Sequence, residues 1–174
     1  MFLARSRSLF SLAFLAAALV MGASLYLEHG VGLEPCSLCV VQRLFLAGFC
    51  LVSLLGALHG PGRFGRRVYG VLGLLFALAG AATAARQVLL QQVPLEQLMI
   101  CQPGLHCLMQ QVSFFKALQL MFRATAECAQ IHWTLFDLSI PEWSLLAFVG
   151  MSLMAIYQIA ASVVGARWGA GSDR

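Results

Sequence analysis

The sequence predicts an all-α protein, a bundle of four transmembrane helices with one long outward-facing loop that carries short surface helices. The 174-residue chain is 60% hydrophobic and only 10% charged, with a mean hydropathy of +0.84. Soluble domains carry about 25% charged residues. Four apolar stretches approach or exceed the length of roughly 20 residues that crosses a bilayer. We therefore expect one integral membrane domain over residues 1–174, embedded in a lipid bilayer.

The four spans are expected at about residues 8–27, 41–58, 68–85 and 144–165. The first is an uncharged run of 20 residues, longer than the 7–15-residue apolar core of a cleaved signal peptide, and further spans follow it. It is therefore expected to remain as a helix. Apolar residues cover the whole circumference of each expected helix, as is typical of helices in lipid.

The distribution of basic residues predicts the topology. With four spans, both termini and the turn at residues 60–67 share one side, which carries seven of the eleven basic residues: Arg5, Arg7, Arg63, Arg66, Arg67, Arg167 and Arg174. The positive-inside rule places this side in the cytoplasm. The loop at about residues 87–143 then faces outward, where its helical segment at residues 114–123 is expected on the membrane surface or as a cap on the bundle. The basic residues are scattered without interleaved aromatics, which argues against nucleic-acid binding.

A CxxC pair, Cys36 and Cys39, lies at the outer edge of the second span. Cysteines at this spacing on a turn form labile, easily exchanged disulfides. The closed loop is too small for a structural disulfide to restrict the unfolded chain much. A zinc site would need a second ligand pair of standard spacing, which Cys101, His106 and Cys107 do not provide. The pair is therefore interpreted as redox-active, and no metal is predicted.

Three polar residues lie near this pair in the expected topology. Arg43 follows Cys39 by four residues, so both project from one helix face. An arginine so close to lipid is costly and functional by default. It could stabilise a thiolate or bind an oxygen of a reducible ligand, and the alternative is snorkelling to the head groups. Gln87 and Gln91 share a helix face and could line a polar rim for a quinone-like head group, or be satisfied by water.

A second pair, Cys101 and Cys128, is separated by 26 residues of the outward loop. A structural disulfide and exchange with the first pair are both open, because a bond here closes a long loop. Cys107 could also pair in place of Cys101. Cys50 falls in mid-span, where it is expected to be a small buried apolar residue.

These features together resemble the disulfide bond formation protein B (DsbB) family of bacterial inner-membrane thiol–quinone oxidoreductases. The likeness covers nearly the whole chain. Its motifs are Pro35-Cys36-Ser37-Leu38-Cys39-Val40-Val41-Gln42-Arg43, Cys101-Gln102-Pro103-Gly104-Leu105, Glu127-Cys128-Ala129 and Leu138-Ser139-Ile140-Pro141-Glu142-Trp143.

The resemblance implies a complete electron path. A reduced periplasmic thiol oxidase of the DsbA type would attack the Cys101–Cys128 disulfide at Cys101. Electrons would pass to Cys36–Cys39, and Cys39 would form the adduct with ubiquinone or menaquinone beside Arg43. The membrane quinone pool would then carry the electrons away, which supports disulfide bond formation in periplasmic proteins.

Two departures from the family pattern concern these sites. Some members carry a histidine near the position of Gln87, and related sequences often lack a cysteine at Cys107. An extra thiol six residues from Cys101 could scramble the relay, so we expect it to be shielded.

Three other functions compete with this one. A membrane reductant would be expected to carry thiols within its spans, where only Cys50 lies. A non-catalytic adaptor would use its disulfides only to hold the loop. A transporter is disfavoured because no charge lies in mid-span and no broken inverted repeat is present.

Overall fold

Four long helices make up the computed structural model, which describes residues 2–32, 36–91, 134–135 and 138–170. They are α1 (Phe2–His29), α2 (Ser37–His59), α3 (Arg63–Leu90) and α7 (Ile140–Ala170). Each contains a stretch long and apolar enough to span a membrane: Arg7–His29, Leu38–His59, Phe64–Leu90 and Ile140–Val163. The predicted all-α, four-span fold class is confirmed. Cys101, Cys107, Cys128 and the segment at 114–123 lie outside the described residues.

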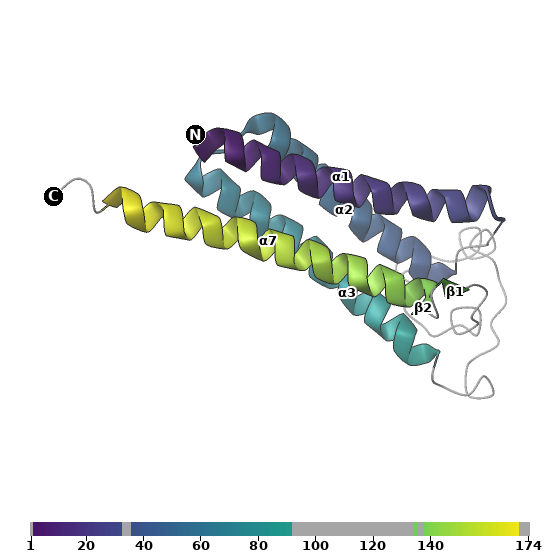
Figure 1. Cartoon of the computed structure of the whole chain (residues 1–174). Helices are drawn as coiled ribbons and strands as arrows, with labels where there is room; N and C mark the ends of the chain where they lie inside the picture. The colour runs from purple at the N-terminus through teal and green to yellow at the C-terminus, as the bar shows by residue number, and fades with distance from the viewer. Residues whose placement is uncertain (1, 33–35, 92–133, 136–137, 171–174) are drawn as a thin grey trace, which may run out of the picture.

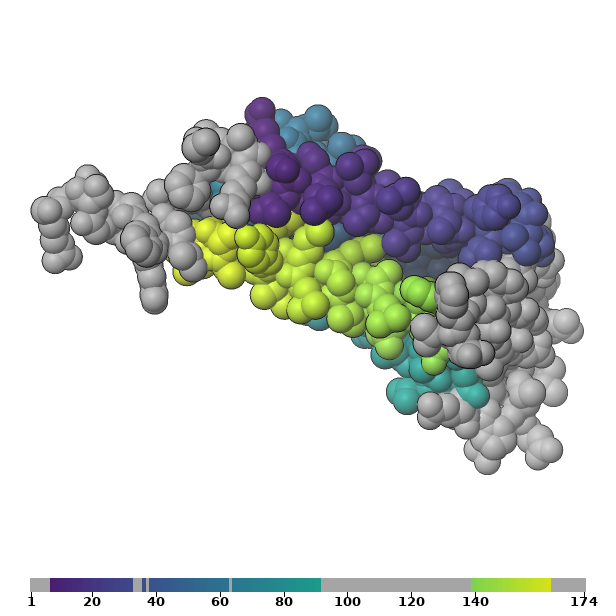
Figure 2. Space-filling model, viewed as in Figure 1, coloured from purple at the N-terminus to yellow at the C-terminus, as the bar shows by residue number. Residues whose placement is uncertain are grey.

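The helices form an elongated bundle (Figure 1). The N-terminal end of α1 and the C-terminal end of α7 lie together, while the α1–α2 connection and the end of α3 lie at the opposite end. α1 packs mainly on α2, α2 on α3, and α3 on α7, whereas α1 and α7 contact each other far less. Figure 2 shows these two helices side by side on one face of the molecule. Among the pairs of described helices that pack against each other, α1 and α7 therefore share the least tightly packed seam.

The core combines small and aromatic residues: Ala13, Ala17, Leu46, Phe49, Ala77, Ala84, Phe148 and Met151. Small residues let membrane helices approach closely, since lipid itself supplies no hydrophobic drive for their association. The α3–α7 contact is an example, because the ring of Phe148 lies directly over Gly80. Large apolar side chains such as Leu19 and Leu44 point outward, as expected for lipid-facing surfaces.

The outer ends of α2 and α7 begin several residues before the apolar stretches of the sequence. α2 starts at Ser37, with Cys36 as its extended N-cap residue, so the CxxC pair occupies the first turn of a helix and not a separate turn. α7 follows a small antiparallel ladder in which β1 (Thr134–Leu135) pairs with β2 (Leu138–Ser139). Both helices therefore begin in residues outside the apolar stretches, which a search for apolar length does not register.

The side chain of Glu142 caps the start of α7. Glu142 accepts hydrogen bonds from the backbone N–H of Ser139 (2.6 Å) and from its hydroxyl (2.9 Å). The Ser-x-x-Glu spacing is the usual signature of such a helix start. The Ser139 hydroxyl also lies 3.1 Å from Oε1 of Gln91, the C-cap residue of α3. This contact ties the outer ends of α3 and α7 together.

Candidate functional site

The cysteine pair sits at the N-terminus of α2. Cys36 is the N-cap residue, with φ −66° and ψ 164°, and Cys39 lies in the first turn. Their Sγ atoms are 3.0 Å apart, so only a small movement separates them from the S–S bond length of about 2.05 Å. A helix N-terminus also stabilises a nearby negative charge such as a thiolate, because unsatisfied backbone N–H groups and the positive end of the helix dipole lie there.

The side chain of Gln87 reaches this pair from α3. Its Nε2 lies 3.3 Å from Sγ of Cys36 and 3.4 Å from Sγ of Cys39. Its Oε1 accepts a hydrogen bond of 2.7 Å from Nε2 of Gln42, on α2. Both glutamines are buried, with exposed fractions of 4% and 5%. The amide pair therefore joins α2 to α3 directly beneath the sulfur atoms.

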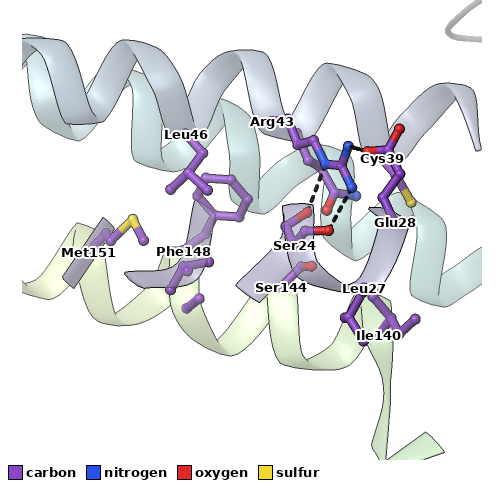
Figure 3. A pocket seen from close by; sticks show the side chains of 13 residues that line it. Ser24, Leu27, Glu28, Cys39, Arg43, Leu46, Ile140, Ser144, Phe148 and Met151 are labelled. Atoms are coloured by element: carbon purple, nitrogen blue, oxygen red, sulfur yellow. Dashed lines mark hydrogen bonds and ion pairs between the residues drawn. The ribbon is translucent and has the colours of Figure 1, made fainter. Parts of the chain in front are cut away.

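Arg43 is held by α1. Its Nε donates to the Ser24 hydroxyl at 2.7 Å, and one terminal nitrogen donates to the Ser24 carbonyl at 2.9 Å. The other terminal nitrogen forms an ion pair with Glu28. Figure 3 shows the guanidinium between these two residues. An arginine snorkelling to head groups would extend away from the bundle, whereas this side chain is fixed across a helix interface.

A cavity of about 100 Å³ lies beside Cys39 and Arg43. Three helices line it: α1 with Val20, Ser24, Leu27 and Glu28, α2 with Cys39, Gln42, Arg43 and Leu46, and α7 with Ile140, Ser144, Ala147, Phe148 and Met151. Polar groups occupy the end near Cys39, and Leu46, Phe148 and Met151 form an apolar end (Figure 3). Within the described residues, the lining joins α1 and α7 across their seam.

The structure brings together four of the residues that the sequence singled out: Cys36, Cys39, Arg43 and Gln87. Gln91 lies one turn beyond Gln87 and contacts Ser139. Neither glutamine lines the cavity, and their contact with a quinone stays a prediction.

Sequence reasoning missed three residues of this site: Ser24, Glu28 and Gln42. One signal was present for the first two, since a serine and an acid four residues apart share a face at the outer end of the first span. An acid at that depth calls for a cationic partner. Gln42 carried no such signal, because an amide beside an arginine is unremarkable in sequence.

Comparison with known proteins identifies the family. Residues 6–158 match the family described as disulfide bond formation protein DsbB. The chain belongs to the DsbB family. It is 50% identical to disulfide bond formation protein B of Stutzerimonas stutzeri strain A1501 over 157 residues, which cover 90% of this chain and 96% of the relative. It is 58% identical to disulfide bond formation protein B 1 of Pseudomonas aeruginosa PAO1 over 156 residues, with the same two coverages.

Membership of the DsbB family confirms the resemblance drawn from the cysteine and arginine motifs. Together with the four apolar helices, it makes the chain a multi-pass membrane protein of the disulfide-generating oxidoreductase class. The CxxC pair lies at the N-terminal end of the second of these apolar helices, α2.

Proposed function

We propose that this DsbB-family protein is a protein-dithiol:quinone oxidoreductase that reoxidises a periplasmic thiol oxidase of the DsbA type. One observation carries the proposal: Cys39 and Arg43 line the same cavity, at the seam between α1 and α7. The net reaction balances, because the periplasmic dithiol loses two electrons and two protons as it becomes a disulfide. A bound ubiquinone or menaquinone would accept the two electrons and the two protons and leave as quinol.

The chemistry of the cavity lining suits a quinone head group. Its volume of about 100 Å³ is smaller than the ~150 Å³ cavity that accepts a benzene-sized ring, so the head group also needs room at the seam between α1 and α7. Arg43 and Ser144 offer hydrogen-bond donors for ring oxygens at the polar end. Leu46 and Phe148 offer apolar surface for the ring. A seam with few contacts between α1 and α7 suits the entry of a lipid-soluble molecule from the bilayer.

The positions of the two cysteines divide the work between them. Cys39 lines the cavity and Cys36 does not, so Cys39 is the residue that delivers electrons to the acceptor. Cys36, the half-buried N-cap residue of α2, is then the residue that exchanges with the outer pair, Cys101 and Cys128. Attack by the dithiol substrate on Cys101 would start this exchange, as the family resemblance implies.

Arg43 supplies positive charge where the acceptor becomes more negative during reduction. Its contacts with Ser24 and Glu28 preorganise the guanidinium, so little reorganisation is needed as charge develops. In this proposal the outer ends of the helices face the periplasm, both termini lie in the cytoplasm, and the bilayer is the bacterial inner membrane.

Quinone reduction by the purified full-length chain in detergent, supplied with a reduced DsbA-type protein, tests the proposal. The expected result is turnover in the wild type and its loss in Cys39→Ser, Cys36→Ser and Cys101→Ser. Cys50→Ser is the matched control, because Cys50 lies in mid-span outside the cavity lining. A folded wild-type protein that reduces no quinone with a competent donor would overturn the proposal in favour of a reductant or an adaptor.

A further inference from the structure

We propose that Gln87 is a catalytic hydrogen-bond donor to the sulfur atoms of Cys36 and Cys39, and that Gln42 is a positioning residue that orients the Gln87 amide. The inference rests on the proposed function, because it concerns the same cysteine pair. The geometry is specific: one amide nitrogen lies 3.3 Å from one sulfur and 3.4 Å from the other.

Burial makes the orientation of the Gln87 amide well defined. Its exposed fraction is 4%, and a polar group at such a depth needs hydrogen-bond partners within the protein. Gln42 donates to Oε1 at 2.7 Å, which turns the NH₂ group toward the sulfurs. A disulfide or a thiolate has no hydrogen to donate. The observed orientation is therefore the one that provides a hydrogen bond throughout the redox cycle.

Disulfide exchange gives this hydrogen bond a chemical purpose. When a thiolate attacks the Cys36–Cys39 disulfide, one S–S bond breaks, a new one forms, and the departing sulfur takes the negative charge. Hydrogen bonds to charged acceptors are worth more than those to neutral ones. The amide of Gln87 therefore stabilises the departing thiolate more than it stabilises the disulfide.

The arrangement assigns different tasks to the amide and the guanidinium. The hydrogen bonds of Arg43 run to Ser24 and Glu28 on α1 and lie at the cavity. The amide of Gln87 reaches the sulfurs from α3, outside the cavity lining. The donor to the sulfurs can therefore be removed without changing a side chain that lines the cavity.

The test measures how fast the reduced cysteine pair is alkylated, without quinone or a partner protein. The full-length protein in detergent is reduced and mixed with iodoacetamide at pH 7, and labelling of the peptide with Cys36 and Cys39 is followed by mass spectrometry. Gln87→Met removes the donor and keeps an unbranched side chain of similar length. Thr83→Val is the matched control, since Thr83 is a buried polar residue on α3, one turn before Gln87, and bonds to Gly80 of its own helix.

Gln87→Met is expected to slow alkylation about three- to tenfold. Loss of a hydrogen bond to the charged sulfur lowers the thiolate fraction, and roughly half of this change is offset by the higher intrinsic nucleophilicity of a less stabilised thiolate. Gln42→Met should slow the reaction by a smaller factor, because the donor remains but its orientation is no longer fixed. Thr83→Val should react at the wild-type rate.

A purely packing role gives a different pattern. Gln87→Met would then retain the wild-type alkylation rate, and that result in a folded variant overturns the inference. If Gln87→Met does not fold, Gln42→Met decides: a wild-type rate in this variant overturns the positioning role and with it the inference. Since alkylation requires no quinone, a wild-type protein that fails to reduce quinone would refute the proposed function without altering this result.

Discussion

A methyl group added at Gly80 should close the proposed quinone cavity from behind. A Cβ at this position of α3 would lie 2.5 Å from Cδ1 and from Cζ of Phe148, whereas ordinary carbon contacts begin at 3.4 Å. The ring therefore has to move by more than about 0.9 Å, the difference between these distances, because its Cε1 atom would lie closer still to the Cβ. Phe148 is only 3% exposed and lines the cavity. Because α3 is on its other side, the ring moves away from α3, toward the cavity.

The expected effect of Gly80→Ala is a rise of about tenfold in the apparent quinone KM. Overpacking of a tight contact costs about 1–3 kcal/mol, and about 1.4 kcal/mol corresponds to a factor of ten in binding. Quinone titration of the purified protein at saturating dithiol substrate measures this KM. A thermal melt in the same detergent shows how much of the strain is taken up instead by separation of α3 from α7.

Gly73→Ala is the matched control on the same helix. A Cβ there would lie 3.5 Å from the nearest atom of Phe49, an ordinary contact, so both the KM and the melting temperature should stay at wild-type values. Adding Phe148→Leu to Gly80→Ala should restore quinone affinity, because the smaller side chain makes room for the methyl group. A wild-type KM and melting temperature in Gly80→Ala itself would refute the placement of Phe148 between α3 and the cavity.

Three further outcomes are expected. Arg43→Ala should raise the apparent quinone KM about tenfold or more, since a charged hydrogen-bond donor is worth about 1.5–3 kcal/mol. The KM of Arg43→Lys should fall between those of Arg43→Ala and the wild type, because lysine keeps the charge but not the planar fork. Unchanged quinone titrations in both variants would make Arg43 a structural residue. Ser139→Ala should lower the melting temperature by about 2–4 °C through loss of the cap on α7, with calorimetry or a fluorescence melt as the check and no shift as the contrary result. Cys50→Ser should leave quinone turnover at the wild-type rate, and a loss of turnover in a folded variant would bring Cys50 into the relay.

The fold could be predicted from the sequence because one property, apolar length, decides it. Four stretches long enough for a bilayer leave few other arrangements, and the described part of the chain contains four such helices. The positions of the helix ends were harder to predict from the sequence. α2 begins at Ser37, four residues before the predicted span, and α7 begins at Ile140, four before Ser144. At the start of α7, Ser139 and Glu142 hydrogen-bond to each other, whereas Cys36 makes no side-chain cap hydrogen bond at the start of α2.

The site was predictable only within single helices. The spacing of Cys39 and Arg43 puts both on one face of α2, and both line the cavity. The contacts between helices could not be predicted from the sequence in the same way. Glu28 meets Arg43 and Gln42 meets Gln87 because of how α1, α2 and α3 are rotated against one another. Rotation depends on packing at many positions, and no local pattern of residues encodes it.

The register of α2 is consequently the property on which the whole site depends. Cys39, Gln42 and Arg43 occupy one turn of α2. Cys39 lines the cavity, Gln42 bonds to α3 and Arg43 bonds to α1. A slip of one residue would rotate each by about 100° and break all three relations.

Two features hold the register of α2. Gly60 ends the helix in a left-handed conformation, with φ 55° and its N–H bonded to the Gly56 carbonyl, a position that favours glycine. In mid-helix, Gly48 receives the ring of Phe76 from α3 so closely that a Cβ would lie 2.6 Å from the ring. Only a residue without a side chain fits beneath that ring, so neighbouring registers, which would place Ala47 or Phe49 there, are excluded. The positions of the reacting groups at the outer end of α2 thus depend on two glycines, Gly48 in the middle of the helix and Gly60 at its other end.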